Sequence, residues 1–406
     1  MDFHFPSLGI NITIRKEVRY MNNIGTLFTV KNETSKTAGC DHLKKYKAIA
    51  LILVFSVIFV WCTATVCFAE DNAENNNLIK TNSKLHWGED KRIIIDSDTG
   101  GDDALAILMA AMSPNITIEG VTVLQGNVPL EQAANNALMT LEMAGCDCEV
   151  YLGATTSLDG IERKTFSVFG SDGMGDQNLI HPSRKPSDKS AVDFILETVR
   201  KYPDEIEIAA IGPVTNIANA ILQDPETMSH VKRIWSMGTA GLGQGNATPV
   251  AEFNVYKDVE AYKVMLDSGI KITIIGLDIC QQAEAFFNAL QLAIMESGNP
   301  TLQYVSRAFR KLLEFRMQTR GLDNVDICDA IAMGCLIWSD YVVNGIDCKA
   351  SCITQDCEAH GQVIFYRTDL VYDSMPEIGN ANVRLITEIN LNHFFENVMS
   401  LLSKMN

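Results

Sequence analysis

The sequence has few basic residues relative to acidic ones. Its 406 residues include 33 Lys and Arg against 50 Asp and Glu, which gives a formal net charge of -17. A general nucleic-acid-binding protein needs basic surface to displace the counterions of phosphates, so this charge argues against nucleic acid as a partner. The charge fits a protein that uses some carboxylates to hold a cation, although most of these acids are expected to be solvated surface.

The sequence also lacks internal repeats and the composition of a disordered chain. Hydrophobic residues make up 47% of it and charged residues 20%, which is typical of a globular protein. Because no repeat period is present, we expect a single folded domain. We place it at 91–406, a length that is common for α/β domains.

The first 90 residues differ from the rest of the chain. An N-terminal extension, 1–47, has no sustained apolar period and ends with lysines, and 48–69 is a run of 22 uncharged residues. This run is long enough to cross a bilayer as a helix, and its positive flank also fits a cleaved secretory signal. We therefore expect a signal peptide or signal-anchor helix at 48–69, a polar linker at 70–90, and a domain that is secreted or membrane-anchored outside the cytoplasm.

The cysteines lack the spacing of a structural zinc site. Eight of the 11 follow the apolar run, including Cys146 and Cys148 and the cluster Cys348, Cys352 and Cys357. The cluster has no paired second half with ligand spacing, which argues against zinc. In an exported protein these cysteines could form disulfides, with a connectivity that the sequence does not define.

Strand and helix patterns alternate from residue 92 onward. We expect strands at 92–95, 116–124, 206–211, 233–237 and 272–275, and helices at 104–112, 129–145, 214–222, 259–266, 301–319 and 329–338. This alternation predicts an α/β fold with a mainly parallel central sheet flanked by helices. Such sheets bind ligands beyond the carboxyl ends of their strands, and the informative motifs fall in loops at that edge.

Four carboxylates fall within eight residues directly after the first expected strand. They are Asp96, Asp98, Asp102 and Asp103 in the segment IIIDSDTGGDDALA, where two glycines permit a tight turn between the pairs. Like charges packed this closely are costly unless a cation offsets them, and Ca²⁺ and Mg²⁺ prefer such oxygen ligands. An aspartate that caps the next helix would explain one of the four. We therefore expect a metal or catalytic site here.

Several separated segments together resemble one enzyme family. The acidic segment is similar to the N-terminal DxDxGxDD motif of the inosine-uridine nucleoside hydrolases, with Thr99 where proline is usual. Further family motifs resemble QGNVPLEQAANNA from Gln125, IGPVTNIANA from Ile211, GNATPVAEFNVYKD from Gly245 and DICDAIA from Asp326. The resemblance spans Lys91 to the C-terminus. It implies the Rossmann-like architecture of these enzymes, calcium-dependent hydrolysis of ribonucleosides, and a homo-oligomer, a dimer or tetramer.

The resemblance also implies a role for each matching residue. Calcium ligands would be Asp98, Asp103, the backbone carbonyl of Thr215, and Asp329. Contacts to the ribose would come from Asp102, Asn127, Met237, Asn246, Glu252 and Asn254. The catalytic residues would be Asp98 as general base toward water, Asp102 through its grip on the sugar, and Cys328 at the position of the leaving-group acid.

Two positions depart from the usual family pattern. Cys328 stands where many members have a histidine that assists loss of the base, although some branches carry cysteine. A thiol replaces an imidazole poorly unless its pKa is shifted, so water or a group outside these motifs could protonate the base. Phe169 stands where many members also have histidine, and its ring could stack on a base or pack within a lid.

Two other functions remain open on the sequence. A magnesium-dependent phosphatase of the haloacid-dehalogenase type also has a DxD pair after a strand, which Asp96 and Asp98 fit, but its motif expects Thr or Val at Gly100. The other is an exported calcium- or nucleoside-binding protein without catalysis, which only Cys328 favours.

Overall fold

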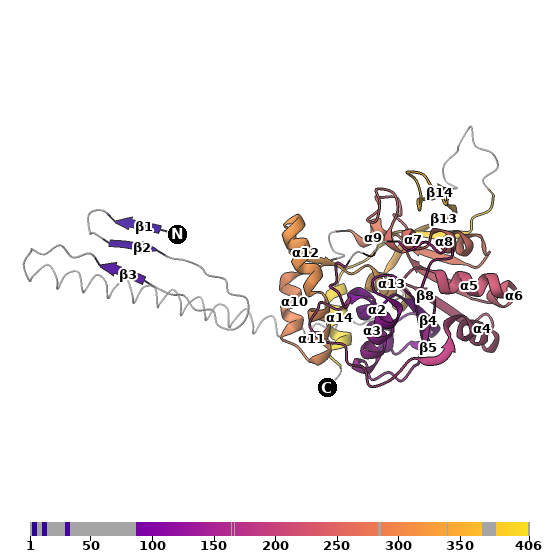
Figure 1. Ribbon diagram of the computed structural model, residues 1–406, viewed down its shortest axis with the longest axis horizontal. Coiled ribbons are helices and arrows are strands. Elements are labelled where there is room, and N and C mark those ends of the chain that lie inside the picture. The colour runs from indigo at the N-terminus through magenta and orange to yellow at the C-terminus, as the bar shows by residue number, and fades with distance from the viewer. Residues whose placement is uncertain are drawn as a thin grey trace, which may run out of the picture. The chain divides into compact units, whose positions relative to one another are not determined.

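The computed structural model describes residues 2–5, 10–13, 29–32 and 87–404, apart from 164, 166, 283–285, 339 and 368–378. The chain divides into two units, Met1–Thr81 and Asn82–Asn406. In the first unit, β1 (Asp2–Phe5), β2 (Ile10–Thr13) and β3 (Thr29–Asn32) pair as an antiparallel sheet (Figure 1). The predicted targeting segment 48–69 lies outside the described residues. Among the helices that are described, none combines the length and apolar character needed to cross a membrane.

A ten-stranded sheet forms the centre of the second unit. Its order is β14-β13-β15-β10-β9-β8-β4-β5-β6-β7. The strands are β4 (Lys91–Ser97), β5 (Ile116–Val123), β6 (Val150–Leu152), β7 (Ser187–Ser190), β8 (Ile206–Ala210), β9 (Arg233–Met237), β10 (Ile272–Ile275), β13 (Val342–Cys352), β14 (Val363–Arg367) and β15 (Val383–Ile389). All pairings from β15 to β7 are parallel, and β13 is antiparallel to both of its neighbours. The predicted α/β fold with a mainly parallel sheet is confirmed.

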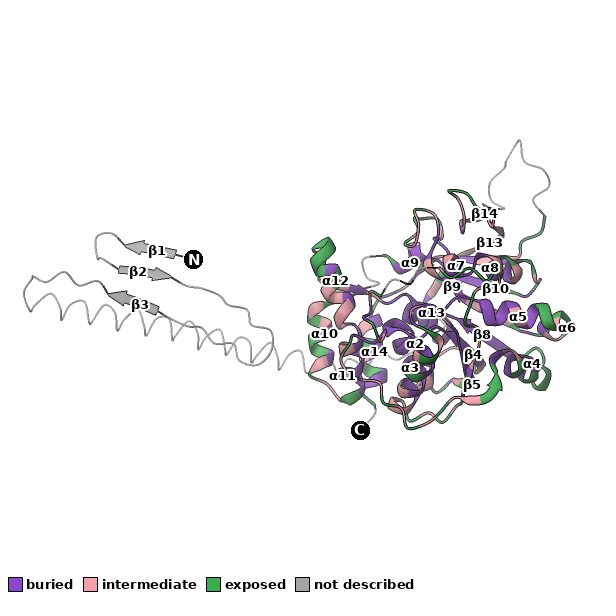
Figure 2. Cartoon of the chain, in the orientation of Figure 1, coloured by how far each residue is buried: buried purple, intermediate pink, exposed green. Residues whose placement is uncertain are grey.

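Helices cover both faces of this sheet. They are α2 (Gly101–Ala111), α3 (Leu130–Met143), α4 (Ala191–Lys201), α5 (Thr215–Gln223), α6 (Pro225–Met228), α7 (Phe253–Lys257), α8 (Val259–Asp267), α9 (Leu277–Cys280), α10 (Ala289–Glu296), α11 (Pro300–Ala308), α12 (Arg310–Arg320), α13 (Cys328–Ile337) and α14 (Phe394–Leu402). One core contains side chains of α2, α3, α11, α13 and α14, and the other contains those of α4, α5 and α8. Figure 2 shows the buried strands β4, β8 and β9 between these helices. A separate pair, β11 (Phe286–Asn288) and β12 (Asn324–Asp326), is antiparallel.

The sequence of β4 explains why helices cover both faces. Ile93, Ile94 and Ile95 have no exposed surface. Ile93 and Ile95 belong to one core and Ile94 to the other, because successive side chains of a strand point to opposite faces. A continuous run of β-branched residues is typical of a parallel sheet that is covered on both sides.

The strand order changes direction beside β4. From β4 the chain continues to β5, β6 and β7 on one side, and it then returns to β8, β9 and β10 on the other. The loops that leave β4 and β8 therefore separate at the carboxyl ends of these strands. A switch point of this kind leaves a crevice for ligands. Asp98 and the residues 211–214 lie there.

Two helices differ from their predicted extents by more than two residues. The helix predicted at 104–112 begins at Gly101, so Asp102 and Asp103 lie in its first turn. The earlier start is stabilised because the Asp103 carboxylate accepts the backbone N–H of Gly100. The helix predicted at 301–319 is two helices, α11 and α12, which meet at Phe309, whose side chain is fully buried in the core.

The disulfides that these cysteines could form in an exported protein are absent from the described part of the chain. All eight cysteines after residue 87 are free thiols. Within the predicted cluster, Cys348 and Cys352 are buried and Cys357 is exposed. Cys348 and Cys352 belong to the second hydrophobic core, so we interpret them as packing residues.

Ser190 gives a test of how α4 is anchored. Its side chain accepts the backbone N–H of Asp193 at 3.1 Å and so caps the helix. We expect Ser190→Ala to lower the free energy of unfolding by about 1 kcal/mol, because the N–H loses its acceptor. Thermal melts would measure the loss. Ser187→Ala, at the start of β7, is the control, and an equal drop in both variants would contradict the capping role.

Candidate active site

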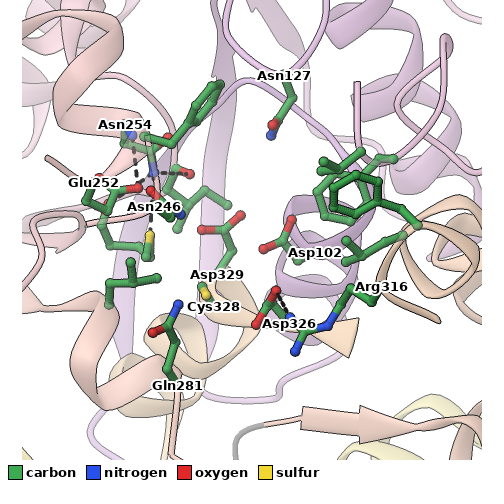
Figure 3. Close-up of a pocket in the computed structure, with 18 of the residues that line it drawn as sticks. Asp102, Asn127, Asn246, Glu252, Asn254, Gln281, Arg316, Asp326, Cys328 and Asp329 are labelled. Carbon is green, nitrogen blue, oxygen red and sulfur yellow. Dashed lines mark hydrogen bonds and ion pairs between the residues drawn. The ribbon is translucent and has the colours of Figure 1, made fainter. Parts of the chain in front are cut away.

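The carboxyl ends of the central strands meet at a cavity of about 350 Å³. Its walls come from the loops after β5, β6, β8 and β9, from β12, and from α2, α7, α9, α12 and α13 (Figure 3). The lining residues are Asp102, Asn127, Val168, Phe169, Ile211, Met237, Asn246, Glu252, Phe253, Asn254, Leu277, Gln281, Leu312, Phe315, Arg316, Arg320, Asp326, Cys328 and Asp329. A cavity of this size, lined by both apolar and polar side chains, is typical of a small-molecule site.

Three carboxylates converge beside this cavity. Asp102, Asp103 and Asp329 each offer an oxygen within 4.8 Å of the others. Asp102 and Asp103 come from the first turn of α2 and Asp329 from the first turn of α13. The positive ends of two helix dipoles therefore face the carboxylates and favour their negative charge. Figure 3 shows Asp102 and Asp329 facing each other in the cavity.

Asp98 is fully buried at the end of β4, next to this cluster. Its Oδ2 accepts the backbone N–H of Asn127, and its Oδ1 has no hydrogen-bond partner in the part of the chain that is described. Gly126 permits this close approach, because a Cβ at that position would lie 2.0 Å from Asp98 Oδ2. A buried carboxylate oxygen without a partner is costly, and a bound cation would satisfy it.

Burial raises the pKa of these carboxyl groups. The pKa values of Asp98 and Asp329 lie well above the usual range, first because the groups are desolvated and then because negative charges surround them. Desolvation and the charge of Asp103 raise the pKa of Asp102 to about 8. A divalent cation would reverse these shifts by favouring the ionised forms. The all-oxygen donor set and the unpartnered Oδ1 of Asp98 both fit such an ion.

Asp103 is both a helix cap and a member of the acidic cluster. Its Oδ2 accepts the Gly100 N–H at 2.9 Å, and its Oδ1 accepts the Ser97 hydroxyl at 2.7 Å. These bonds fix the carboxylate, whose two oxygens have further lone pairs for a cation. The capping role that the sequence left open therefore does not exclude a metal-binding role.

Thr215 lies outside the residues that line the cavity. Its hydroxyl donates to Asp258 Oδ2 at 2.7 Å, and Asp258 in turn caps α8. The expected calcium ligand is the backbone carbonyl of Thr215, so the hydrogen bond of its hydroxyl does not involve the atom that has the expected role.

The wall on the other side of the carboxylates holds Asn246, Glu252 and Asn254 (Figure 3). The Glu252 carboxylate accepts two backbone N–H groups of α7 at 2.9 and 3.1 Å, and burial raises its pKa to about 7. The Asn254 amide donates to the carbonyls of Ile211 and Met237 at 3.2 Å each. These bonds hold the polar groups of the wall in fixed orientations before any ligand binds.

Asp96, one of the four carboxylates of the acidic segment, lies outside the group formed by Asp102, Asp103 and Asp329 and forms a buried hydrogen-bond network with Asn216. Asp96 Oδ1 accepts the Thr122 hydroxyl at 2.6 Å and the Asn216 amide at 2.8 Å. The Asn216 carbonyl accepts the backbone N–H of Ala154 at 2.8 Å. These bonds connect β4 and β5 with α5 and the loop after β6, so they hold the loops of the site together. Asp96 lies in the acidic segment and Asn216 in the IGPVTNIANA motif, and this placement was the sequence signal that could have found them.

The side of the cavity formed by α12 was also missed by sequence reasoning. Gln281, Phe315, Arg316 and Arg320 line it, and Asp326 forms an ion pair with Arg316. Asp326 opens the DICDAIA segment, but the others lie outside every quoted motif. A helical pattern predicts α12 itself but does not show which of its side chains face the cavity.

The two positions that depart from the family pattern both line the cavity. Contact with Cys280 and burial raise the pKa of the Cys328 thiol well above its ordinary value, so the thiol stays protonated at neutral pH. Phe169 is 8% exposed, and its ring packs 6.1 Å from the ring of Phe309. A Cβ on Gly101 would lie 2.9 Å from the Phe169 ring, so the ring packs against the start of α2 as well as lining the cavity.

Comparisons with known proteins agree on one family. The family described as "Inosine-uridine preferring nucleoside hydrolase" matches residues 93–396. "Uridine nucleosidase 1" of Arabidopsis thaliana is 45% identical over 197 residues, which cover 48% of this chain and 59% of that protein. "Non-specific ribonucleoside hydrolase RihC" of Escherichia coli (strain SMS-3-5 / SECEC) is 35% identical over 236 residues, which cover 58% of this chain and 76% of that protein.

Two solved structures also resemble the chain. "Plant nucleoside hydrolase - PpNRh1 enzyme" has a TM-score of 0.70 and 30% identity, over 78% of this chain and 98% of that one. "Purine-Preferring Ribonucleoside Hydrolase from Gardnerella vaginalis" has a TM-score of 0.69 and 26% identity, over 77% of this chain and 98% of that one. These findings confirm the resemblance stated from the sequence motifs and argue against the phosphatase alternative.

The acidic cluster predicts how stability depends on pH without a divalent cation. We expect the thermal midpoint in a chelator to fall as pH rises from about 5 to about 8. The folded protein holds protons on groups such as Asp102, with a pKa of about 8, that the unfolded chain releases near pH 4. Stability from such groups is present at low pH and lost as pH rises through the folded pKa.

Asp329→Asn should make this decline shallower, and Ca²⁺ should raise the midpoint of the parent at pH 8. Asp188→Asn, at an exposed position, is the matched control. Equal pH slopes for the two variants would contradict the account of the buried cluster.

Proposed function

The chain belongs to the inosine-uridine preferring nucleoside hydrolase family, and we propose that it hydrolyses the N-glycosidic bond of ribonucleosides to free base and ribose, with Ca²⁺ as cofactor. The observation that carries this proposal is the cluster of buried carboxylates at the cavity, beside a wall of fixed polar side chains. The names of the relatives, a uridine nucleosidase and a ribonucleoside hydrolase, support this class of substrate.

Asp98, Asp103, Asp329 and the Thr215 carbonyl are the proposed Ca²⁺ ligands. When bound, the ion would lower the pKa of a water molecule and so make hydroxide accessible near neutrality. The grouping of Asp103 and Asp329 and the unpartnered oxygen of Asp98 support this assignment. Asp102 belongs to the same group and contributes charge to it.

Asp98 acts as the general base in this proposal. Its carboxylate takes a proton from water as the water oxygen attacks the anomeric carbon and the base departs. The Asn127 N–H bond to Asp98 Oδ2 fixes the orientation of the carboxylate. The negative charges around it favour the oxocarbenium-like transition state, as in other glycoside hydrolyses.

The polar side chains of the cavity hold the ribose. Asp102 and Asn127 lie on one side of the proposed sugar position, and Asn246, Glu252 and Asn254 lie on the other. Met237 lines the same cavity, and its backbone carbonyl accepts the Asn254 amide. Because hydrogen bonds inside the protein already orient Glu252 and Asn254, binding costs little further ordering. A sugar held in a fixed orientation reaches the transition state more readily.

Export and assembly are separate proposals that rest on the sequence. We propose that 48–69 directs the domain out of the cytoplasm, as a cleaved signal or an anchor, and that the protein is a dimer or tetramer. Fractionation of cells that express a C-terminally tagged full chain tests the first, and the mass of the purified protein in solution tests the second.

Ribose release tests the proposed function directly. With Ca²⁺ present, we expect ribose from at least one member of a panel of purine and pyrimidine ribonucleosides. A chelator should stop the release and added Ca²⁺ should restore it. Asp98→Ala should lose activity because the general base is removed. If the folded, Ca²⁺-supplied protein binds nucleosides in calorimetry but releases no ribose, it is a binding protein without catalysis.

Deoxynucleosides test the proposed grip on the ribose. We expect kcat/KM for 2′-deoxyuridine to be roughly tenfold to a hundredfold below that for uridine. Without the 2′-hydroxyl, buried polar groups lose a partner at a cost of about 1–3 kcal/mol. Comparable constants for the two substrates would rule out hydroxyl recognition by Asp102 and the bound ion.

A further inference from the structure

The departing base needs stabilisation that the assigned residues do not provide. In the proposed hydrolysis a C–O bond forms at the anomeric carbon while the C–N bond breaks, and the electron pair of that bond stays on the base. The proton from water goes to Asp98, so negative charge develops on the base. Cys328 lines the cavity, but a thiol is a poor replacement for an imidazole as the acid that assists the leaving base. A positive charge near the base would lower the barrier.

Arg316 places such a charge at the wall of the cavity. Its side chain comes from α12, lines the cavity and is 4% exposed. Its Nη1 forms an ion pair with Asp326, and its guanidinium lies 5.0 Å from the centre of the Phe286 ring. Asp326 and Phe286 are themselves paired across β11 and β12. The guanidinium is therefore held from two sides.

The guanidinium also keeps a donor without a partner. The Nε–H of Arg316 is buried, and no described residue accepts it. Buried charged donors are normally matched, so an unmatched one at a cavity wall indicates capacity to interact with a ligand. Arg320, one helical turn further along α12, lines the same cavity and adds positive charge.

The position of Arg316 relative to the sugar wall indicates which part of a nucleoside it would meet. Figure 3 shows Arg316 and Asp326 below the carboxylates of Asp102 and Asp329. Asn127 and the wall that holds Glu252 and Asn254 lie above those carboxylates in the same view. A ribose held between the carboxylates and that wall would leave its base on the α12 side. The cavity would then have carboxylates beside the sugar, where positive charge develops, and a guanidinium beside the base, where negative charge develops.

We propose that Arg316 stabilises the departing base, with Asp326 and Phe286 as its positioning residues, an assignment that rests on the proposed function. A guanidinium does not lose its proton in a protein, so Arg316 acts by charge and hydrogen bonding, not as an acid. The base leaves as an anion or with partial negative charge and takes its proton from water afterwards.

The test compares two leaving groups. Uridine has a poor leaving group, whereas 4-nitrophenyl β-D-ribofuranoside releases a stable anion that needs little stabilisation. We expect Arg316→Gln to lower kcat/KM for uridine by about a hundredfold or more, the size of effect typical for loss of one transition-state donor. For the nitrophenyl riboside the loss should be under about threefold.

Three further measurements separate this role from a structural one. Arg316→Lys should recover part of the uridine activity, because it keeps the charge. The loss in Arg316→Gln should be constant between about pH 6 and 9, whereas loss of a proton donor would change the pH profile. Asp326→Ala, which frees the guanidinium, should show the same difference between substrates with a smaller loss. Arg310→Gln, on α12 and outside the cavity lining, is the control and should match the parent.

The outcomes distinguish the assignment from the function on which it rests. A parent that hydrolyses both substrates, with equal losses or no losses in Arg316→Gln, overturns the assignment alone. Equal losses with a lower thermal midpoint would show that Arg316 only supports the packing of α12 on β12. A folded, Ca²⁺-supplied parent that hydrolyses neither substrate overturns the proposed function and this assignment with it.

Discussion

Four aspartate side chains, Asp98, Asp102, Asp103 and Asp329, are buried together at one edge of the sheet. Desolvation and mutual repulsion make this costly, as their raised pKa values indicate. The fold offsets part of the cost with the N-termini of α2 and α13 and with bonds from Ser97, Gly100 and Asn127. The remainder is offset only by protons or by a cation. The local architecture of the site follows from this requirement.

The parallel sheet supplies the frame that brings these groups together. Because the strand order reverses beside β4, the loops after β4 and β8 diverge and leave room for a ligand. The buried network of Asp96 and Asn216 then connects neighbouring strands and loops below that space. Gly126 has no side chain that would block the approach of Asp98 to the next loop. These hydrogen bonds make the loops of the site rigid and so hold the buried carboxylates in fixed positions.

The charges of the cavity follow the chemistry proposed for it. Carboxylates gather where a sugar would gain positive charge, and Arg316 lies on the side where a base would gain negative charge. Cys328 lines the same cavity, but its thiol is a poor replacement for an imidazole acid. In this arrangement the loss of an imidazole at residue 328 does not leave the base without assistance, because a permanent cation on α12 faces the same cavity.

The sequence by itself determined the α/β class, through the alternation of β-branched runs and helical patterns, and the acidic loop, through the spacing of Asp96 to Asp103. These features are local, because the backbone geometry of a strand or a turn determines how residues a few positions apart are arranged. Motif resemblance added Asp329, Glu252 and Asn254, which local spacing alone could not connect to the loop.

Only the tertiary structure decided that Arg316 and Asp326 complete the cavity, that Asp103 caps α2 as well as joining the cluster, and that the helix predicted at 301–319 is divided at Phe309. Each of these depends on which face of one element packs against another. Residues distant in the sequence meet through that packing, and hydrophobic periodicity predicts an element but not the partner against which each of its faces lies.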